Sequence, residues 1–355
     1  MRLNTMSALL LAAGWLLAAR PLGAQTAPRP VQPVQSPEAK AKAEKEAKEA
    51  ARVAAEGEII LELKYDDMEL VDLIKSLALQ AEINVLFDPK LTQVNRDKEG
   101  QVIPNAKVIQ VLYGAGTYAP YVAPTGAGTT GAFYSGVLGS SYVTWLNGDY
   151  KTTTPAQTIG AGTFAGQVQI TPSATNAPST QNICTKSGAL RVKDTQIQAE
   201  LKAQIAAGKL PAPDLNTYYA IYFPAGVGIS QGTSCSGVSG GFCAYHGTVP
   251  AAGTVSEFYY GVIPDFTGAA FATGCGTSTQ YGNVTSVSSH ELIEAITDPE
   301  VGIATVLGKP LAWYNNTYGE IGDICNGQQA TITGTDGASY VVQKEWSNSG
   351  QICRV

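Results

Sequence analysis

The most informative stretch of the chain is SSHELIEAITDP, residues 288–299. Its apolar residues recur at helical spacing and predict a helix over about 285–297. The closing Asp-Pro pair ends that helix, because proline cannot continue one. The predicted helix buries an apolar face made of Leu292, Ala295 and Ile296. His290 and Glu294 lie one turn apart and point to one side of it.

Segments before and after this helix predict a mixed sheet. Short runs rich in β-branched and aromatic residues predict strands at 108–113, 218–223 and 257–263. A second helix is predicted over 196–207 and is closed by Gly208. Asp336-Gly337 predicts a hairpin turn between two β-rich segments. Residues 104–355 are therefore expected to form one α+β domain, a mixed sheet with an active-site helix.

The amino terminus predicts export. Residues 1–24 combine a basic start, a short apolar run and a small-residue site before Gln25, which is the pattern of a secretory signal peptide. The apolar run is too short to span a bilayer comfortably, and no later segment approaches transmembrane length. We expect a secreted protein, periplasmic or extracellular, with no transmembrane segment after signal removal.

A linker and a small unit are predicted next. Residues 25–57 begin as a Pro/Gln-rich tether and continue as an Ala/Lys/Glu helical spacer. Residues 58–95 have a strand–helix–strand pattern, which predicts a small βαβ unit. Within it, residues 58–92 resemble the short N-terminal module of secretins and TonB-dependent receptors. The unit is either a small packing domain or a docking site for an envelope partner.

Cysteine usage agrees with an oxidising compartment. All six cysteines lie in the carboxyl-terminal part, and an even count in an exported chain indicates a disulfide-stabilised domain. Cys235–Cys243 would close a short loop, and Cys325–Cys353 would tie down the C-terminus. No C-x-x-C pair occurs, which argues against a zinc ribbon. The formal net charge of −6 and the lack of a basic patch argue against a nucleic-acid partner.

The residues around His290 are similar to a zincin metal motif. In H-E-x-x-H, two imidazoles on one helical face hold Zn²⁺, and the adjacent glutamate activates the bound water. Here Glu294 stands at the position of the second imidazole. His290 and Glu294 are therefore the expected metal ligands on a zincin-like helix, and Glu291 is the expected general base.

A third ligand is expected from the segment GEIGDIC, residues 319–325. Glu320 is the first candidate and Asp323 the alternate, because the neighbouring glycines would let this backbone approach closely. The extra carboxylates make the site harder, so Zn²⁺ is favoured and Mn²⁺ or Ca²⁺ are alternatives. Between His290 and Asp323 the only basic residue is Lys309, and clustered carboxylates repel one another unless a cation or solvent relieves them.

The chain has one other histidine, His246, three residues after Cys243. If it faces His290, it is a further ligand or a transition-state hydrogen-bond donor. We assign it an assisting catalytic role.

Each candidate also has a structural explanation. HExxE occurs by chance in helices, and a histidine among acids can be a salt-bridged structural residue. Glu320 and Asp323 can bind backbone amides in a turn, and Asp298 can belong to a simple helix stop. His246 can be an ordinary loop residue.

The same motifs resemble the EXORDIUM, or phosphate-induced, family of secreted plant proteins, and more closely its bacterial relatives. The resemblance covers about residues 104–355 and consists of motifs in a fixed order: VIQVLYG (108–114), LKAQIAAGKLPAPDLNTYYAIYFPAG (201–226), CAYHG (243–247), SHELxE (289–294), Asp298-Pro299, Trp313-Tyr314 and EIGDIC (320–325). It implies a secreted cell-wall-associated or extracellular protein and supplies no established reaction. The first hundred residues lie outside the resemblance.

Three functions follow from these patterns. The leading one is a secreted metal-dependent, peptidase-like hydrolase that acts on a peptide or cell-wall-associated substrate. The second is a non-catalytic extracellular binding or signalling protein with a structural cation site. The third is an envelope adaptor that docks through residues 58–92. A catalytic metal site keeps an open position in a cleft, whereas a structural site is closed.

Overall fold

The computed structural model describes residues 100–153, 156–180, 190–238, 241–267, 274–300, 311–315 and 317–355. The predicted signal peptide, tether, spacer and βαβ unit lie outside these residues.

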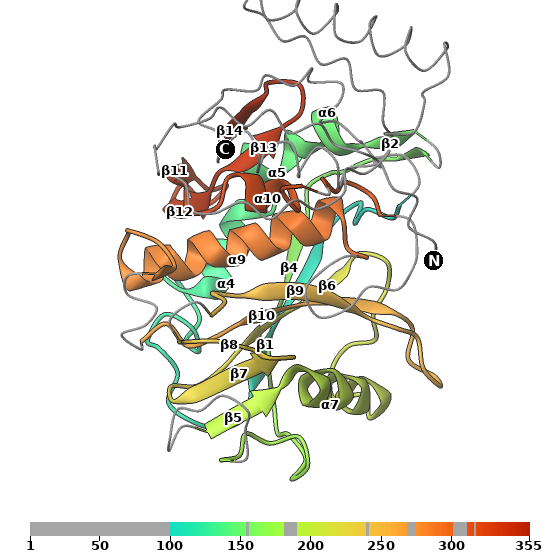
Figure 1. Cartoon of the computed structure of the whole chain (residues 1–355), viewed down its shortest axis with the longest axis vertical. Coiled ribbons are helices and arrows are strands. Elements are labelled where there is room, and N and C mark those ends of the chain that lie inside the picture. Colours follow the sequence, from blue (N-terminus) through green and yellow to red (C-terminus); the bar gives the residue numbers. More distant parts are fainter. Residues whose placement is uncertain are drawn as a thin grey trace, which may run out of the picture. The chain divides into compact units, whose positions relative to one another are not determined.

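The largest sheet has five strands in the order β4-β1-β6-β10-β9 (Figure 1). The strands are β1 (Lys107–Tyr113), β4 (Thr163–Ile170), β6 (Thr217–Tyr222), β9 (Tyr245–Val249) and β10 (Phe258–Ile263). Parallel pairs join β4, β1, β6 and β10, and β9 pairs antiparallel with β10. The three predicted strands coincide with β1, β6 and β10 to within one residue. The predicted mixed sheet and α+β class are therefore confirmed.

Side chains that alternate along the strands build a core on each face of this sheet. Helix α9 (Gln280–Thr297) lies on one face and helix α7 (Asp194–Ala206) on the other (Figure 1). On β6, the residues that join the α9 core are Tyr218, Ala220 and Tyr222, and those that join the α7 core are Tyr219 and Ile221. Alternate side chains of the central strand β6 thus point to opposite faces of the sheet, and those of Tyr218, Ala220 and Tyr222 lie on the face that packs against α9.

Helix α9 begins five residues earlier than predicted. Thr279 is its N-cap, and the Thr279 side chain accepts a hydrogen bond from the main-chain N–H of Gly282. The first turn lacks the apolar spacing that located the rest of the helix. Its end is as predicted, because Asp298 is the C-cap and Asp298 Oδ1 accepts a 2.9 Å bond from Ala312 N.

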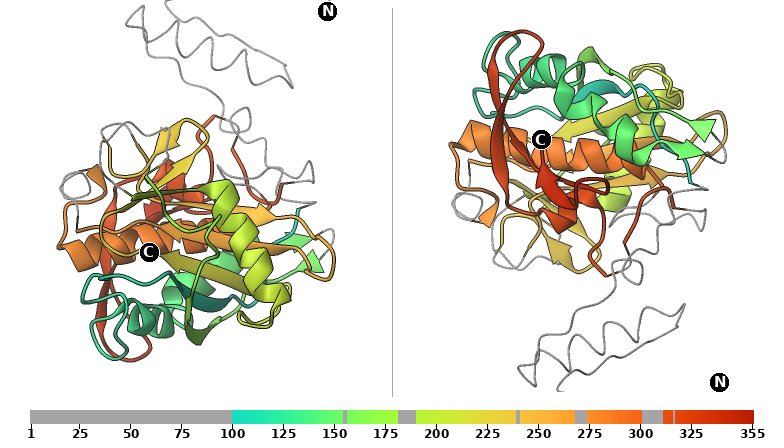
Figure 2. Two further views of the ribbon diagram at one scale, coloured as in Figure 1. Left: turned by 90° about the horizontal axis from the view of Figure 1, so that it is seen from below. Right: turned by 90° about the horizontal axis from the view of Figure 1, so that it is seen from above.

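The carboxyl-terminal segments cover the side of α9 that faces away from the sheet. Strands β11 (Gln329–Thr333) and β12 (Ser339–Gln343) form an antiparallel hairpin, and β12 packs on α9 (Figure 2, right). The predicted turn at Asp336-Gly337 joins them, with Gly337 at φ +78°. Helix α10 (Ile321–Ile324) also contacts α9. The helix that bears His290 is therefore held between the sheet and this hairpin layer.

Shorter elements complete the described part. Helix α7 begins two residues before the predicted 196–207 segment and ends at Ala206, one residue before its predicted end. Ala207 is the C-cap, and Gly208 follows the cap at φ +68°, as expected of a helix-ending glycine. The remaining elements are α4 (Thr130–Val137), α5 (Ser141–Thr144), α6 (Leu146–Tyr150), β2 (Thr152–Thr153), β3 (Ala156–Gln157), β5 (Leu190–Lys193), β7 (Val227–Gln231), β8 (Ser234–Cys235), β13 (Glu345–Ser347) and β14 (Ile352–Arg354).

Two disulfides are described, and one of the two predicted pairings is wrong. Cys325–Cys353 forms as predicted. Cys243 pairs with Cys275, with 5.6 Å between their Cα atoms, and not with Cys235. The reason is that Cys235 ends β8 in the three-stranded β5-β7-β8 sheet, whereas Cys243 leads into β9 of the large sheet. The Cys243–Cys275 bridge thus ties the start of β9 to the segment before α9.

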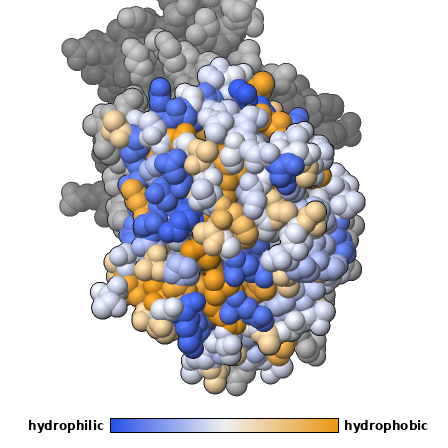
Figure 3. Space-filling model, turned by 180° about the vertical axis from the view of Figure 1, so that it is seen from behind, coloured by the Kyte–Doolittle hydropathy of each residue, from blue (hydrophilic) through white to orange (hydrophobic). Residues whose placement is uncertain are grey.

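The surface of the described part mixes residue types. Figure 3 shows the side opposite to Figure 1, where hydrophobic residues gather in the lower half between hydrophilic ones. The exposed large hydrophobic side chains among the described residues are Leu190, Leu215, Tyr318 and Ile352. Within the described ranges, no helix has the length and apolar character needed to cross a membrane.

Candidate metal centre

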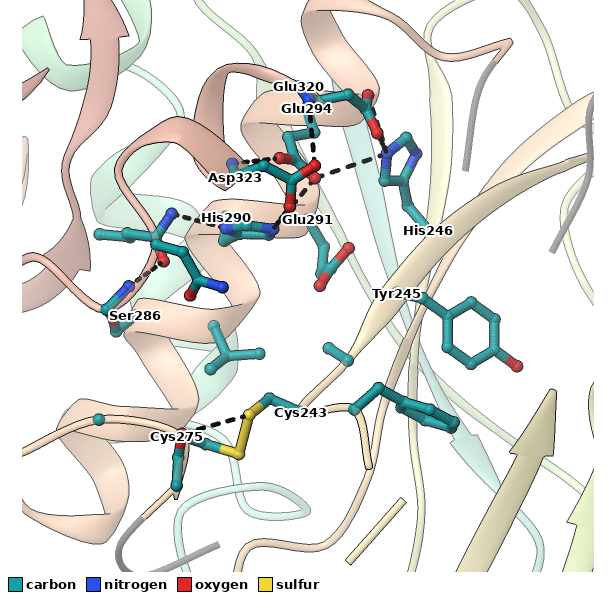
Figure 4. Close-up of a pocket in the computed structure, with 18 of the residues that line it drawn as sticks. Cys243, Tyr245, His246, Cys275, Ser286, His290, Glu291, Glu294, Glu320 and Asp323 are labelled. Carbon is teal, nitrogen blue, oxygen red and sulfur yellow. Dashed lines mark hydrogen bonds and ion pairs between the residues drawn. A yellow bond between two sulfur atoms is a disulfide. The ribbon is translucent and has the colours of Figure 1, made fainter. Parts of the chain in front are cut away.

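Three elements bring all six predicted site residues together (Figure 4). Strand β9 provides His246, and α9 provides His290, Glu291 and Glu294. Glu320 is the N-cap of α10, and Asp323 lies in its first turn.

One triad consists of His290, Glu294 and Asp323, whose ligand atoms lie within 4.8 Å of one another. His290 Nε2 lies 3.1 Å from Glu294 Oε2 and 3.9 Å from Asp323 Oδ1. The His290 and Glu294 side chains are 13% and 3% exposed, whereas that of Asp323 is 45% exposed. This triad therefore has a solvent-facing side. The alternate third ligand, Asp323, joins it, and Glu320 does not.

The second triad consists of His246, Glu291 and Glu294, and all three are buried. His246 Nε2 lies 3.7 Å from Glu294 Oε2. It also lies 3.0 and 3.1 Å from the two carboxylate oxygens of Glu320. Glu320, the first candidate for third ligand to His290, is thus a partner of His246. The two triads share Glu294, and each contains one imidazole.

Glycines in the α10 segment allow this close approach, as the sequence suggested. A Cβ on Gly322 would stand 2.6 Å from His290 Nδ1 and 2.7 Å from Glu294 Oε1. Gly319 has φ +84°, and a Cβ there would collide with Asp323 Oδ2. No larger residue fits at either position without moving a candidate ligand.

The structural explanation offered for Asp323 is correct for one of its oxygens. Asp323 Oδ2 accepts a 3.0 Å hydrogen bond from the main-chain N–H of Glu320 and so caps the short helix. Asp323 Oδ1 remains turned toward His290. Capping therefore orients the carboxylate and leaves one oxygen for a cation.

Gln343, at the end of β12, is a site residue that the sequence did not reveal. Its side-chain Nε2 lies 2.6 Å from His290 Nδ1 and donates a 2.9 Å bond to the carbonyl of Gly322. Its main-chain N–H donates to Ser289 Oγ at 2.9 Å. A metal-binding histidine usually donates its second ring N–H to an acceptor, which fixes the ring. Gln343 holds the His290 ring at this position, but its amide nitrogen can only donate, so Nδ1 is the acceptor of the bond and a metal on Nε2 would require an acceptor to replace it.

Burial and mutual repulsion perturb the titrating groups. Burial lowers the pKa of His246 to about 4, so this imidazole is neutral near pH 7. Burial alone would also lower the pKa of His290, but the Glu294 carboxylate raises it well above its usual value. Burial raises the pKa of Glu291 to about 8, with Glu294 and Asp323 adding to the rise. Burial and the neighbouring acids raise the pKa of Glu320 well above its usual range.

The donor set fits a divalent cation. Imidazole and carboxylate groups are ligands that Zn²⁺ and Mn²⁺ accept. Among the ion pairs of the described ranges, those of the site acids involve only the two histidines, so no Lys or Arg there relieves the repulsion. His246 Nδ1 is buried without a hydrogen-bond partner, so the burial of this imidazole is only partly compensated. A cation bound at the shared Glu294 carboxylate would relieve the electrostatic repulsion among these acidic side chains.

A cleft of about 350 Å³ adjoins these residues. Figure 4 shows the Glu291 side chain pointing into it and the Tyr245 ring pointing away. Its walls include the Cys243–Cys275 bridge, both histidines and all four site acids. The arrangement thus places the candidate cation ligands beside an open cleft.

Comparison of the chain with family models, curated proteins and solved structures found no match. The resemblance to the EXORDIUM family therefore remains a prediction from the motifs.

Proposed function

We propose that residues 104–355 form a secreted metal-dependent hydrolase of the peptidase-like kind. The observation that supports this most is that the His290–Glu294–Asp323 triad borders a cleft of about 350 Å³. A metal at this triad would keep a position open toward the cleft, as catalytic sites do.

His290, Glu294 and Asp323 would hold the metal. A divalent ion bound there would polarise a carbonyl oxygen and lower the pKa of a bound water. Zn²⁺ is the first choice, and the two carboxylates of the triad also suit Mn²⁺ or Ca²⁺.

Glu291 would be the general base. It follows His290 on α9, is 4% exposed and points into the cleft (Figure 4). Its carboxylate would accept a proton from the attacking water and deliver it to the leaving amine. The pKa of about 8 applies to the chain without a cation, and a nearby positive charge would lower it toward the ionised form that a base requires.

His246 would assist from the opposite wall. It is 2% exposed, lines the cleft and is neutral near pH 7 because burial lowers its pKa to about 4. Its Nε2–H would donate to the Glu320 carboxylate, which keeps the imidazole directed at the shared Glu294. In this role His246 orients the carboxylates of Glu320 and Glu294 beside the metal.

Export is part of the proposal. The two described disulfides are compatible with an extracellular protein. The signal-peptide pattern of residues 1–24 and the EXORDIUM resemblance support secretion and a peptide or cell-wall-associated substrate. The envelope partner suggested for residues 58–92 remains a separate prediction.

One observation favours a second function. The His246–Glu291–Glu294 triad is buried at all three positions, as a closed structural cation site would be. A cation held there, with none at the open triad, would indicate a non-catalytic extracellular binding protein.

Elemental analysis of the mature protein, purified without chelating resin, tests the proposal. We expect near-stoichiometric zinc or manganese in the parent and its loss in His290→Ala/Glu294→Ala. Asp214→Asn, an acid outside the cluster that pairs with Lys107, is the control and should keep the metal. Glu291→Gln should also keep the metal and lose peptide hydrolysis. If the parent contains neither zinc nor manganese, the hydrolase proposal is overturned. The site would then bind calcium or have a purely structural role.

A further inference from the structure

We propose that the cleft contains a subsite for one apolar side chain, so that the protein cuts peptides beside residues such as Leu, Met or Phe. The subsite is the apolar wall of the cleft, which is formed by Phe242, the Cys243–Cys275 bridge and Val287. The inference rests on the proposed hydrolase function and names the substrate class of that same site.

The four residues of the apolar wall are all partly exposed, although each lies at the edge of a hydrophobic core. Cys243, Cys275 and Val287 pack against the core on the α9 side of the sheet. Phe242 packs against the core on the α7 side. All four line the cleft. Apolar surface left open inside a concave site is typical of a ligand pocket, because the ligand covers that surface when it binds.

Helix α9 has an inverted pattern where it borders this wall. Between Gly282 and Ser289, every residue of the helix is buried except Val287. The buried residues on either side of it are Ser286 and Ser288, which carry hydroxyl groups. A helix that packs on a sheet usually places apolar residues inside and polar residues outside. The valine at this one open position gains free energy when an apolar group covers it.

Contacts on both sides hold the apolar wall in place. The Cys243–Cys275 bridge links the segment before β9 to the segment before α9, with 5.6 Å between the Cα atoms. The Phe242 ring meets the Tyr245 ring edge-on at 5.1 Å, and the Tyr245 hydroxyl donates a 2.8 Å hydrogen bond to the buried Asp194. A wall that is already formed loses little conformational entropy when a ligand binds.

The apolar wall adjoins the candidate metal centre. Val287 precedes His290 by three residues on α9, which corresponds to a rise of about 4.5 Å. Cys243 likewise precedes His246 by three residues. Figure 4 shows the bridge at one end of the cleft and His246 at the other, with the Glu291 side chain between them. An extended peptide advances about 3.3 Å per residue. A peptide bond held at the metal would therefore place one of its two flanking side chains against the wall.

The test uses the zinc-loaded mature protein and acetylated, amidated peptides of one length. Each of the two positions that flank the scissile bond is made Leu, Ala or Ser in turn. At one of these positions we expect kcat/KM to fall at least about tenfold from Leu to Ala, because loss of even one methylene from an apolar pocket typically costs that much. Ser should be no better than Ala. Equal rates for the three residues at both positions would overturn the inference.

Variants of Val287 test whether the apolar wall is the cause. Val287→Ser should narrow the Leu-to-Ser ratio about tenfold. Val287→Phe should fill the subsite and reverse the order, so that Ala is preferred to Leu. Val168→Ser is the matched control, because Val168 is also partly buried but lies on β4, at the edge of the sheet opposite to β9. An unchanged ratio in both Val287 variants, or an equal effect of Val168→Ser, would contradict the assignment.

A binding measurement separates this inference from the proposed function. Zinc-loaded Glu291→Gln should bind a fluorescein-labelled Leu peptide at least about tenfold more tightly than the Ser peptide in fluorescence anisotropy. Absence of any peptide cleavage by the zinc-loaded parent would overturn the hydrolase, whereas equal binding of the two peptides would overturn the subsite. Sedimentation of the parent and Val287→Ser tests the alternative occupant, a second copy of the chain. A dimer that only the parent forms would mean that this copy covers the wall, and the inference would then be wrong.

Discussion

The main-chain N–H of Asp323 donates a 3.0 Å hydrogen bond to Glu294 Oε1. Because this bond engages one carboxylate oxygen from the side of α10, Glu294 Oε2 is left facing His290 and His246 at 3.1 and 3.7 Å. The orientation of the shared ligand is thus fixed by the backbone of a neighbouring element. Preorganisation of this kind lowers the cost of binding a cation.

Gly322→Ala should weaken metal binding strongly. The added methyl group would stand 2.6 Å from His290 Nδ1 and 2.7 Å from Glu294 Oε1, so at least one ligand must move. Displacement of supporting groups around a metal typically costs 10- to 100-fold in affinity. Competition with a fluorescent chelator would measure the zinc dissociation constant. Gly148→Ala is the matched control, since a Cβ there meets nothing within 4 Å, and equal affinities in the two variants would contradict the close-approach argument.

Gln343→Glu should raise metal affinity by about 10- to 100-fold without adding a ligand. In the parent, the Gln343 amide nitrogen can only donate to His290 Nδ1 at 2.6 Å, which favours the imidazole proton on Nε2, the nitrogen that faces the other ligands. A carboxylate at this position would accept from Nδ1–H and leave Nε2 free for the metal. Titration with zinc against a chelator measures the dissociation constant, and Gln343→Ala is the comparison that removes the amide without supplying an acceptor. The positioning role would be wrong if the Glu variant bound zinc no more tightly than the Ala variant.

Local patterns made part of this site predictable. His290, Glu291 and Glu294 are predictable because residues one turn apart share a helix face, and this relation needs no tertiary information. The three predicted strands were likewise readable from short apolar runs. The fold class followed from these elements alone.

The remaining parts depend on tertiary contacts. Asp323 joins the open triad because its other oxygen caps α10, and no spacing rule distinguishes it from Glu320. Gln343 is 53 residues from His290 and is neutral, so neither spacing nor charge indicates it. Cys243 is predicted to pair with the cysteine nearest before it in sequence, but it leads into β9 of the large sheet, whereas Cys235 ends β8 of another sheet. Each of these depends on where segments distant in sequence meet.

Removal of the Cys243–Cys275 bridge should destabilise the domain and loosen the site. The bridge closes a segment with a sequence separation of 32, for which chain entropy predicts about 4 kcal/mol of stability. Urea unfolding of Cys243→Ser/Cys275→Ser would measure the loss. Zinc affinity should also fall, because β9 places His246 three residues after Cys243.

Cys325→Ser/Cys353→Ser is the comparison for that prediction. Its separation of 28 predicts a similar loss of stability. We expect its zinc affinity, at a temperature where both variants are folded, to fall further, because Cys325 is the C-cap of α10 and lies two residues after the proposed ligand Asp323. A loss of zinc affinity in the Cys243→Ser/Cys275→Ser variant with none in the Cys325→Ser/Cys353→Ser variant would contradict the assignment of Asp323 as a ligand.

The metal-free protein should lose stability as the pH rises from about 4.5 to about 8. Burial raises the pKa of Glu291 to about 8, so the folded chain retains a proton that the unfolded chain releases above its ordinary value near 4.5. The stability from this group is complete below pH 4.5 and is lost as the pH rises through 8. His246 acts in the opposite sense, since its pKa falls from 6.5 to about 4 and its contribution is lost as the pH falls through 4.

Glu291→Gln isolates the contribution of the Glu291 carboxyl group to the pH dependence of stability. The difference in unfolding free energy between parent and variant should change by roughly 1.4 kcal/mol per pH unit between about pH 5 and 8, because one proton is involved. Urea denaturation in the presence of a chelator would measure it. Zinc should reverse the trend in the parent, because a bound cation favours the ionised carboxylates. Parallel curves for parent and variant across this range would mean that Glu291 is ionised in the metal-free fold, and the electrostatic description of the buried acids would then be wrong.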